Sequence, residues 1–200
     1  MFSCVILAAG ESRRFGSPKS LVEFEGQTLL NKLVMDLSQP DVDKIVVVLG
    51  SRAELIKHSI LNHRLLQVVH NKDHNFGQTS SLQCGLRHVL PASKGILILP
   101  VDFPEILPDT YRKLIDHFKE EEPLILVPSF KGRKGHPLLF HSDIKEEYLS
   151  LGYEQGMNEV AHRRRNDVRV LKVDDPGVIQ SFNSRKELKA IKDSAKGPST

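Results

Sequence analysis

The sequence predicts an α/β protein, namely a three-layer α/β/α sandwich built around a mostly parallel, mixed sheet. Short continuous runs of β-branched and other apolar residues recur along the chain, as in strands that are covered on both faces. Segments with helical spacing separate these runs, which implies right-handed strand–helix–strand units. Polar and glycine-rich motifs directly follow the apolar runs, at the carboxyl ends of strands, where such sheets bind their ligands.

Each expected element follows from its local pattern. The strands are expected at 2–7, 44–49, 95–99 and 124–127, with weaker candidates at 67–70 and 168–173. The last of these alternates as an edge or antiparallel strand would. Helices are expected at 28–37, 53–61, 80–90 and 109–118. Thr28 and Asp109 are the expected N-caps, and Pro91 lies just past a helix end.

The composition is that of an ordinary soluble globular protein, with 40% hydrophobic and 26% charged residues. A length of 200 residues suffices for one domain with its own core and is short for two. We therefore expect a single domain over residues 1–192. Residues 193–200 have the composition of a disordered C-terminal tail.

The charge and the cysteines limit the function classes. A net charge of +3 and a pI near 8.8 are too weak to indicate nucleic-acid binding, although they suit small anionic ligands. The cationic run at 162–165 is typical of a solvated helix end. Cys4 and Cys84 lack metal-ligand spacing and are expected to be buried, reduced thiols. No apolar run approaches the roughly 20 residues that span a bilayer, so we expect a cytoplasmic protein that binds no membrane.

The most informative motif follows the first expected strand. Residues 7–16 read Leu-Ala-Ala-Gly-Glu-Ser-Arg-Arg-Phe-Gly, and Lys19 follows shortly after. Small residues let backbone N–H groups approach an anion, and Arg14 and Lys19 add positive charge. The register does not match an NTPase phosphate-binding loop, and no dinucleotide-binding Gly-x-Gly-x-x-Gly is present. The motif therefore predicts a phosphate cradle, with a surface loop carrying chance cations as the alternative.

A second polar segment, 71–82, follows another expected strand and leads into a helix. Free N–H groups at a helix start, together with hydroxyl and amide side chains, can hydrogen-bond a base edge or a ribose. The alternative is a capping segment made of turn residues. The candidate nucleotide contacts in this segment are Asn71, Gly77, Ser80 and Ser81.

Asp102 directly follows the expected strand at 95–99. A carboxylate at this edge of a parallel sheet is a natural ligand for Mg²⁺ that bridges phosphate oxygens. In isolation, Asp102 would more simply be a turn residue before Pro104. Taken with a phosphate loop on a different strand, the metal-binding interpretation is favoured, because the two features converge.

The first motif matches Leu-Ala-Ala-Gly-x-Ser-x-Arg-x-Gly-x-x-Lys, which resembles the signature loop of the nucleotidyltransferases that act on molybdopterin. The pattern Asn-x5-Gly-x3-Ser-Leu-x2-Gly at 71–85 is similar to the base-binding segment of that family, and its metal-binding Asp corresponds to Asp102. The resemblance implies a fold like that of the nucleotide-diphospho-sugar transferases. It also implies Mg²⁺-dependent transfer of a nucleoside monophosphate from an NTP to a phosphorylated pterin, with release of pyrophosphate.

The same resemblance implies roles for individual residues. Lys19 and Arg14 would neutralise charge on the α-phosphoryl group and the departing pyrophosphate, so catalysis is mainly positioning and charge stabilisation. Asp102 and Asn183 would hold the metal ion. The loop residues that would contact the nucleotide are Leu7, Ala8, Ala9, Gly10, Glu11 and Ser12.

Two further segments carry the resemblance, and each has an alternative interpretation. Gly135 and His136 belong to a Gly-His-Pro segment that resembles the mark of the cytidylyltransferase branch, where it faces the acceptor; the alternative is a hairpin-like loop with a surface His. Near the C-terminus, relatives usually show Asp-x-Asp-Thr-Pro. Here the first Asp and the Pro are missing, and Asn183 occupies the second metal-ligand position as an uncharged ligand. Alternatively, Ser184 is an N-cap and Asn183 a turn residue.

Ala9 stands where the guanylyl branch usually has Gly, and its methyl group would narrow the base pocket, which favours CTP over GTP. The runner-up function is cytidylyl or uridylyl transfer to a sugar- or polyol-phosphate. A non-catalytic protein that binds and delivers the pterin cofactor is the alternative from another class. The expected partners are an NTP, a phosphorylated pterin and a recipient molybdoenzyme, and the expected state is a monomer or a weak homodimer.

Overall fold

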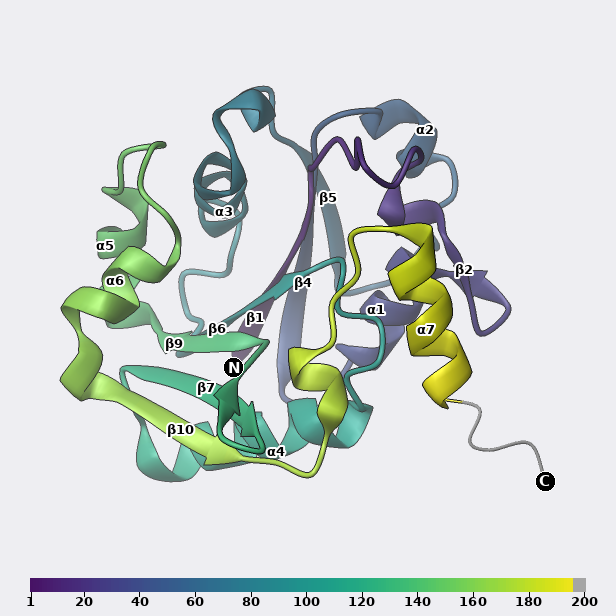
Figure 1. Ribbon diagram of the computed structural model, residues 1–200. Helices are drawn as coiled ribbons and strands as arrows, with labels where there is room; N and C mark the ends of the chain where they lie inside the picture. The colour runs from purple at the N-terminus through teal and green to yellow at the C-terminus, as the bar shows by residue number, and fades with distance from the viewer. Residues whose placement is uncertain (196–200) are drawn as a thin grey trace.

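The computed structural model describes residues 1–195. Within them, eight strands form one mixed sheet in the order β10-β7-β9-β6-β1-β4-β5, with β8 paired to β7 (Figure 1). A separate hairpin joins β2 (Glu23–Phe24) to β3 (Gln27–Thr28). The strands of the sheet are β1 (Phe2–Ala8), β4 (Val42–Leu49), β5 (Leu66–His70), β6 (Gly95–Pro100), β7 (Ile125–Phe130), β8 (Arg133–Lys134), β9 (Leu138–His141) and β10 (Val168–Lys172).

The centre of the sheet is parallel. β1 lies between β4 and β6 and runs parallel to both, and every residue of β1 is buried. β9 is antiparallel to its neighbours β6 and β7, so the sheet is mixed, as expected. β10 is an edge strand, as its alternating pattern indicated, and it pairs in parallel with β7.

Helices cover both faces of the sheet, which confirms the three-layer architecture (Figure 1). Side chains of β1 alternate between two cores: Cys4 and Ile6 pack with α1, α4 and α7, whereas Val5 and Leu7 pack with α3, α5 and α6. The helices of the first face are α1 (Leu29–Asp36), α4 (Pro108–Glu121) and α7 (Arg185–Ala195), with the short α2 (Ala53–Lys57) beside them. Those of the second face are α3 (Gln78–Leu86), α5 (Lys145–Leu149) and α6 (Asn158–Arg163).

The helix ends differ from expectation at identifiable places. Thr28 caps α1 as predicted, because its Oγ1 accepts a hydrogen bond from the N–H of Asn31 at 3.3 Å. The N-cap assigned to Asp109 is wrong: α4 begins at Pro108, with Leu107 as N-cap. Proline is favoured at the first helical position because the N–H it lacks has no partner there.

Two helices are shorter than their apolar spacing indicated. α2 ends at Lys57, and α3 runs only from Gln78 to Leu86. Gly85 lets α3 lie directly on the sheet, because a Cβ there would stand 2.4 Å from Cγ1 of Val5 and 2.9 Å from Cγ2 of Val48. The glycine that ends the base-segment pattern therefore serves close packing of α3 against β1 and β4.

Three remaining expectations concern the ends and the cysteines. α7 continues to Ala195, so residues 193–195 are helical where a tail was expected; residues 196–200 lie outside the described residues. Both cysteines are free thiols, but Cys84 is only partly buried, unlike Cys4. In the described part of the chain, no helix has the length and apolar character that a membrane span requires.

Candidate functional site

A cavity of about 360 Å³ opens at the carboxyl ends of β1 and β6, beside the start of α3. It brings together segments that are far apart in the sequence: the loop after β1, the residues before α3, the end of β6 and the residues before α7. Of the predicted site residues, those that line it are Leu7, Ala8, Ala9, Gly10, Ser12, Arg14, Lys19, Gly77, Ser81, Asp102 and Asn183.

Ser12 shapes the loop after β1. Its φ of 53° is left-handed, and its carbonyl accepts hydrogen bonds from the N–H groups of Phe15 and Gly16, both at 3.0 Å. Its Oγ accepts a further hydrogen bond from the N–H of Lys19 at 3.4 Å. The hydrogen bonds accepted by Ser12 therefore hold the loop in a tight turn, which brings Lys19 back beside the end of β1.

The preceding amides remain available to a ligand. Within the described residues, no acceptor is bonded to the N–H groups of Gly10, Glu11 or Arg13, although the neighbouring Phe15 and Gly16 are satisfied. Gly10 has no atom within 4 Å of the position of an added Cβ and no positive φ, so the fold does not itself require glycine there. An anion-binding loop needs unbonded backbone N–H groups beside a residue without a side chain, and this loop has both.

Lys19 joins the two predicted metal ligands. Its Nζ donates hydrogen bonds to Oδ2 of Asp102 at 3.0 Å and to Oδ1 of Asn183 at 3.1 Å. The Lys19 side chain is 12% exposed, and its Nζ lies 5.1 Å from the centroid of the Phe182 ring. The Asp102 and Asn183 oxygens therefore converge on one positive charge. Such oxygen atoms are the ligands that Mg²⁺ and Mn²⁺ prefer.

Asp102 lies in the turn that directly follows β6, as one alternative held, but its carboxylate does not cap that turn. In the described structure, its carboxylate accepts no backbone hydrogen bond; its recorded partner is the ammonium of Lys19. Its backbone carbonyl accepts a hydrogen bond from the N–H of Phe182 at 3.2 Å, which ties the end of β6 to the segment before α7. The backbone of Asp102 is thus fixed, while its side chain faces the cavity.

A capping arrangement at the start of α7 holds Asn183 in place. Oε2 of Glu187 accepts from the N–H of Asn183 at 2.5 Å and from that of Ser184 at 3.2 Å, and these bonds lower the pKa of Glu187. In return, Oγ of Ser184 accepts from the N–H of Glu187 at 3.2 Å. Ser184 is therefore an N-cap, as one alternative held. Asn183, however, turns its amide oxygen to Lys19 rather than to the helix.

Three predicted nucleotide contacts have other partners. The side-chain amide of Asn71 donates to the hydroxyls of Ser80 and Ser81, at 3.0 and 3.1 Å, and its oxygen accepts from the N–H of Asp73. Ser80 donates inward to backbone carbonyls and is 2% exposed. Glu11 pairs with Arg13 and does not line the cavity. In this structure Asn71 and Ser80 therefore brace the segment that presents Ser81. Nucleotide contact by Asn71, Ser80 and the backbone of Glu11 stays a prediction.

Sequence reasoning missed several residues that line the cavity. His74 and Gln78 lie within the segment already singled out, and their side chains flank Gly77. Phe15 packs edge-on against Phe182, with ring centroids 5.4 Å apart, and so holds the loop after β1 against the segment before α7. The available signal for this buried anchor was a single aromatic residue, Phe15, within an otherwise polar loop.

Gly135 and His136 do not line this cavity; they line a second, separate cavity. The N–H of His136 donates to the carbonyl of Val178 at 2.8 Å, and a Cβ on Gly135 would come within 2.0 Å of that oxygen, so the close approach requires glycine. The His136 ring packs on Phe103 with centroids 4.5 Å apart. Its Nδ1 is buried with no partner in the described structure. The segment does follow a hairpin, formed by β7 and β8, but His136 is partly buried rather than on the surface, unlike the alternative interpretation.

Burial lowers the pKa of His136, and the nearby Asp102 carboxylate offsets part of that effect. Between the lowered folded-state pKa and about 6.5, the unfolded chain binds a proton that the folded chain does not. The free energy of unfolding should therefore fall as the pH drops below about 6.5. We expect His136→Gln to reduce this fall, measured by urea denaturation at several pH values between 5.5 and 7.5.

The matched control for that measurement is His58→Gln, because His58 is exposed on the surface. His58→Gln should keep the wild-type dependence of unfolding free energy on pH. An unchanged dependence in His136→Gln would show that His136 is not the buried neutral base responsible.

A parallel sheet with an open amide loop after its central strand, and a carboxylate, an amide oxygen and a lysine at neighbouring element ends, defines a nucleotidyltransferase of the α/β class. The chain belongs to the family described as the MobA-like NTP transferase domain, whose family model matches residues 4–168. This finding confirms the family resemblance that the loop motif carried.

Individual relatives agree with this assignment. A probable molybdenum cofactor guanylyltransferase of Bacillus cytotoxicus is 29% identical over 153 residues, covering 74% of this chain and 72% of the relative. The crystal structure of Rv0371c from Mycobacterium tuberculosis H37Rv is 26% identical, with a TM-score of 0.83 and coverage of 96% and 97% of the two chains. A structure of Rv0371C in complex with manganese is also similar, at 26% identity, a TM-score of 0.81 and coverage of 96% and 98%.

Proposed function

We propose that this protein transfers a nucleoside monophosphate from an NTP to the phosphate of a molybdopterin-type acceptor, with Mg²⁺ as cofactor and pyrophosphate as the second product. The observation that carries the proposal is the meeting of the open amide loop, Lys19, Asp102 and Asn183 in one cavity. The acceptor class is supported by the name of the Bacillus cytotoxicus relative and by the Gly135–His136 segment.

The triphosphate would bind to the loop after β1. The unbonded amides of Gly10, Glu11 and Arg13 would donate to phosphate oxygens. Arg14 lines the cavity with an exposed guanidinium and would add charge-assisted hydrogen bonds. Lys19 would neutralise charge that develops on the α-phosphoryl group.

Asp102 and Asn183 would hold the Mg²⁺ ion, and bound Mg²⁺ would supply charge neutralisation for the phosphate oxygens. Within the described residues, no group of three or more His, Cys, Asp or Glu side chains could hold a metal. The side chains proposed to hold the metal are Asp102 and Asn183, so we infer that the protein alone binds the metal weakly and that the nucleotide's phosphates strengthen its binding.

The transfer needs little covalent participation from the protein. An oxygen of the acceptor phosphate attacks the α-phosphorus; a new P–O bond forms on one side, and the bond to the pyrophosphate breaks on the other. A phosphate monoester has its second pKa near 6, so the attacking oxygen is mostly deprotonated at neutral pH and needs no general base. The chain's contribution is then orientation and electrostatic stabilisation.

For the base, we propose cytosine. Ala9 is 4% exposed and packs in the core shared with α3, so its methyl group lies on the face of β1 that carries the residues before α3. A methyl group at this place leaves less room for a purine. The second candidate is guanine, because the Bacillus cytotoxicus relative is named a guanylyltransferase.

The proposal is tested with purified protein, Mg²⁺ and each of CTP, GTP, UTP and ATP. We expect CTP to raise the melting temperature in a concentration-dependent way and to release pyrophosphate when a molybdopterin-type acceptor is present. A larger effect of GTP would assign guanylyl transfer. Pyrophosphate release with a sugar- or polyol-phosphate instead would overturn the acceptor, and nucleotide binding without any pyrophosphate release would indicate a binding and delivery protein.

A further inference from the structure

A second cavity, of about 460 Å³, lies on the other side of β6 from the first. We call it the β8–α6 cavity, because residues of both elements line it. The two cavities are adjacent along the chain: Phe103, which lines the second and packs on the His136 ring, directly follows Asp102, which lines the first. An acceptor that fills the β8–α6 cavity would therefore reach the place where the metal ligands lie.

The floor of the β8–α6 cavity is apolar. Phe103 and His136, whose ring centroids are 4.5 Å apart, supply two ring systems on the side toward Asp102. A floor of this kind suits the flat body of a heterocycle. The buried aliphatic residues that line it are Ile98, Val127, Leu138 and Val178.

The rim is cationic, and its charges are not neutralised. No Asp or Glu lines the cavity. In the described part of the chain, no acceptor or ion pair is recorded for the side chains of four basic rim residues, of which three are arginine or lysine. These residues are Arg133 and Lys134 on β8, His162 on α6, and Arg165 just after it, and all four are exposed.

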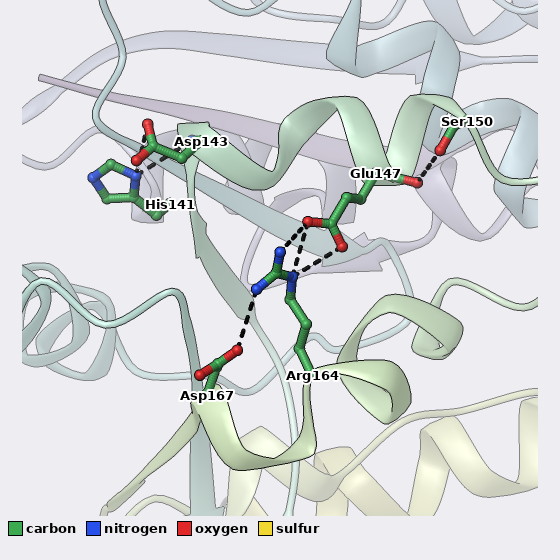
Figure 2. Close-up of polar contacts among 6 residues, drawn as sticks. All are labelled: His141, Asp143, Glu147, Ser150, Arg164 and Asp167. Atoms are coloured by element: carbon green, nitrogen blue, oxygen red, sulfur yellow. Dashed lines mark hydrogen bonds and ion pairs between the residues drawn. The ribbon is translucent and has the colours of Figure 1, made fainter.

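The neighbours of Arg165 show that this absence of partners is specific. Figure 2 shows Arg164 turned toward two carboxylates: its Nε lies 2.9 Å from both oxygens of Glu147, and its Nη1 lies 3.2 Å from Oδ2 of Asp167. Arg163 pairs with Glu159 on its own helix at 3.0 Å. Of three consecutive arginines, two have acidic partners, and Arg165 alone lines the cavity.

We propose that the β8–α6 cavity binds the acceptor, and that Arg165, with Arg133 and Lys134, selects acceptors carrying an anionic group in addition to the phosphate that reacts. This inference rests on the proposed transfer reaction and extends it to a substrate feature. The three residues bring full positive charges from elements that do not line the first cavity. The reacting phosphate must lie beside Asp102, so it does not neutralise cations at the opposite rim; a second anion on the acceptor would.

The test uses pterin-6-carboxylate and uncharged pterin as probes, because they share a flat body and differ in one anionic group. Each is titrated into the full chain loaded with Mg²⁺ and a non-hydrolysable NTP analogue, and binding is followed by pterin fluorescence. We expect the carboxylate to bind at least about tenfold more tightly than uncharged pterin to the wild type, with a strong decrease at high salt. In Arg165→Gln, this preference should fall to about twofold or less.

Arg163→Gln is the matched control. It removes the same charge two residues earlier in the sequence, from an arginine that does not line the cavity and that pairs with Glu159. It should keep the wild-type preference for the carboxylate. Equal binding of the two probes, or an undiminished preference in Arg165→Gln, would overturn the inference while leaving the proposed function intact. The thermal shift of the wild type with NTP and Mg²⁺ tests the proposed function separately, since it involves no acceptor.

Discussion

The Asp102→Asn variant is expected to lose nucleotidyl transfer by a factor on the order of 10³ while it keeps its fold. The substitution removes the negative charge but preserves the shape of the side chain. The carboxylate contacts Lys19 and, within the described residues, satisfies no backbone donor, so its loss leaves no helix or turn uncapped. Turnover is measured as pyrophosphate release, and the fold is followed by thermal unfolding.

Asp116→Asn is the matched control for this variant, because Asp116 is exposed on α4, remote in the fold from the lining of the first cavity. It should leave both turnover and melting temperature near their wild-type values. If Asp102→Asn instead lowers the melting temperature and retains most of its turnover, Asp102 is a turn residue before Pro104 and the metal site must be sought elsewhere.

The predictable part of this site is the part that strand ends determine. The apolar runs at 2–7 and 95–99 correspond to β1 and β6, and residues that follow neighbouring parallel strands reach the same edge of a sheet. The proximity of Lys19 and Asp102 could therefore be predicted from the sequence, although 83 positions separate them. The contact between Lys19 and Asn183 needed more, since it depends on how the segment before α7 crosses the sheet.

The sequence alone does not indicate which partners the polar groups of the candidate site residues take within the fold. Asn71 and Ser80 have the polar groups that a nucleotide contact requires, but the fold uses those groups to satisfy one another and the backbone of their own loop. A sequence pattern shows hydrogen-bonding capacity and not its direction. In the same way, the run at 162–165 looks uniformly cationic, and only the positions of Glu147 and Asp167 separate the paired Arg164 from Arg165.

The Lys19→Met variant should show two changes of opposite sign. Turnover should fall by about 10²–10³-fold, because a preorganised positive charge at the reacting phosphoryl group is lost. Binding of Mn²⁺ to the nucleotide-free protein should become tighter. Lys19 Nζ contacts both oxygens that would hold the metal, at 3.0 and 3.1 Å, so a metal ion must compete with an ammonium for them.

The metal affinity is measured by titration with Mn²⁺, whose free ion is detected by electron paramagnetic resonance, and turnover by pyrophosphate release. Lys113→Met is the control, since Lys113 pairs with Asp109 on the exposed face of α4 and should change neither quantity. Weaker Mn²⁺ binding in Lys19→Met would mean that Lys19 orders Asp102 and Asn183 rather than competing with the metal. Tighter binding together with slower transfer would mean that Lys19 exchanges these oxygens for the phosphates of the nucleotide as the metal enters, so that nucleotide and metal bind cooperatively.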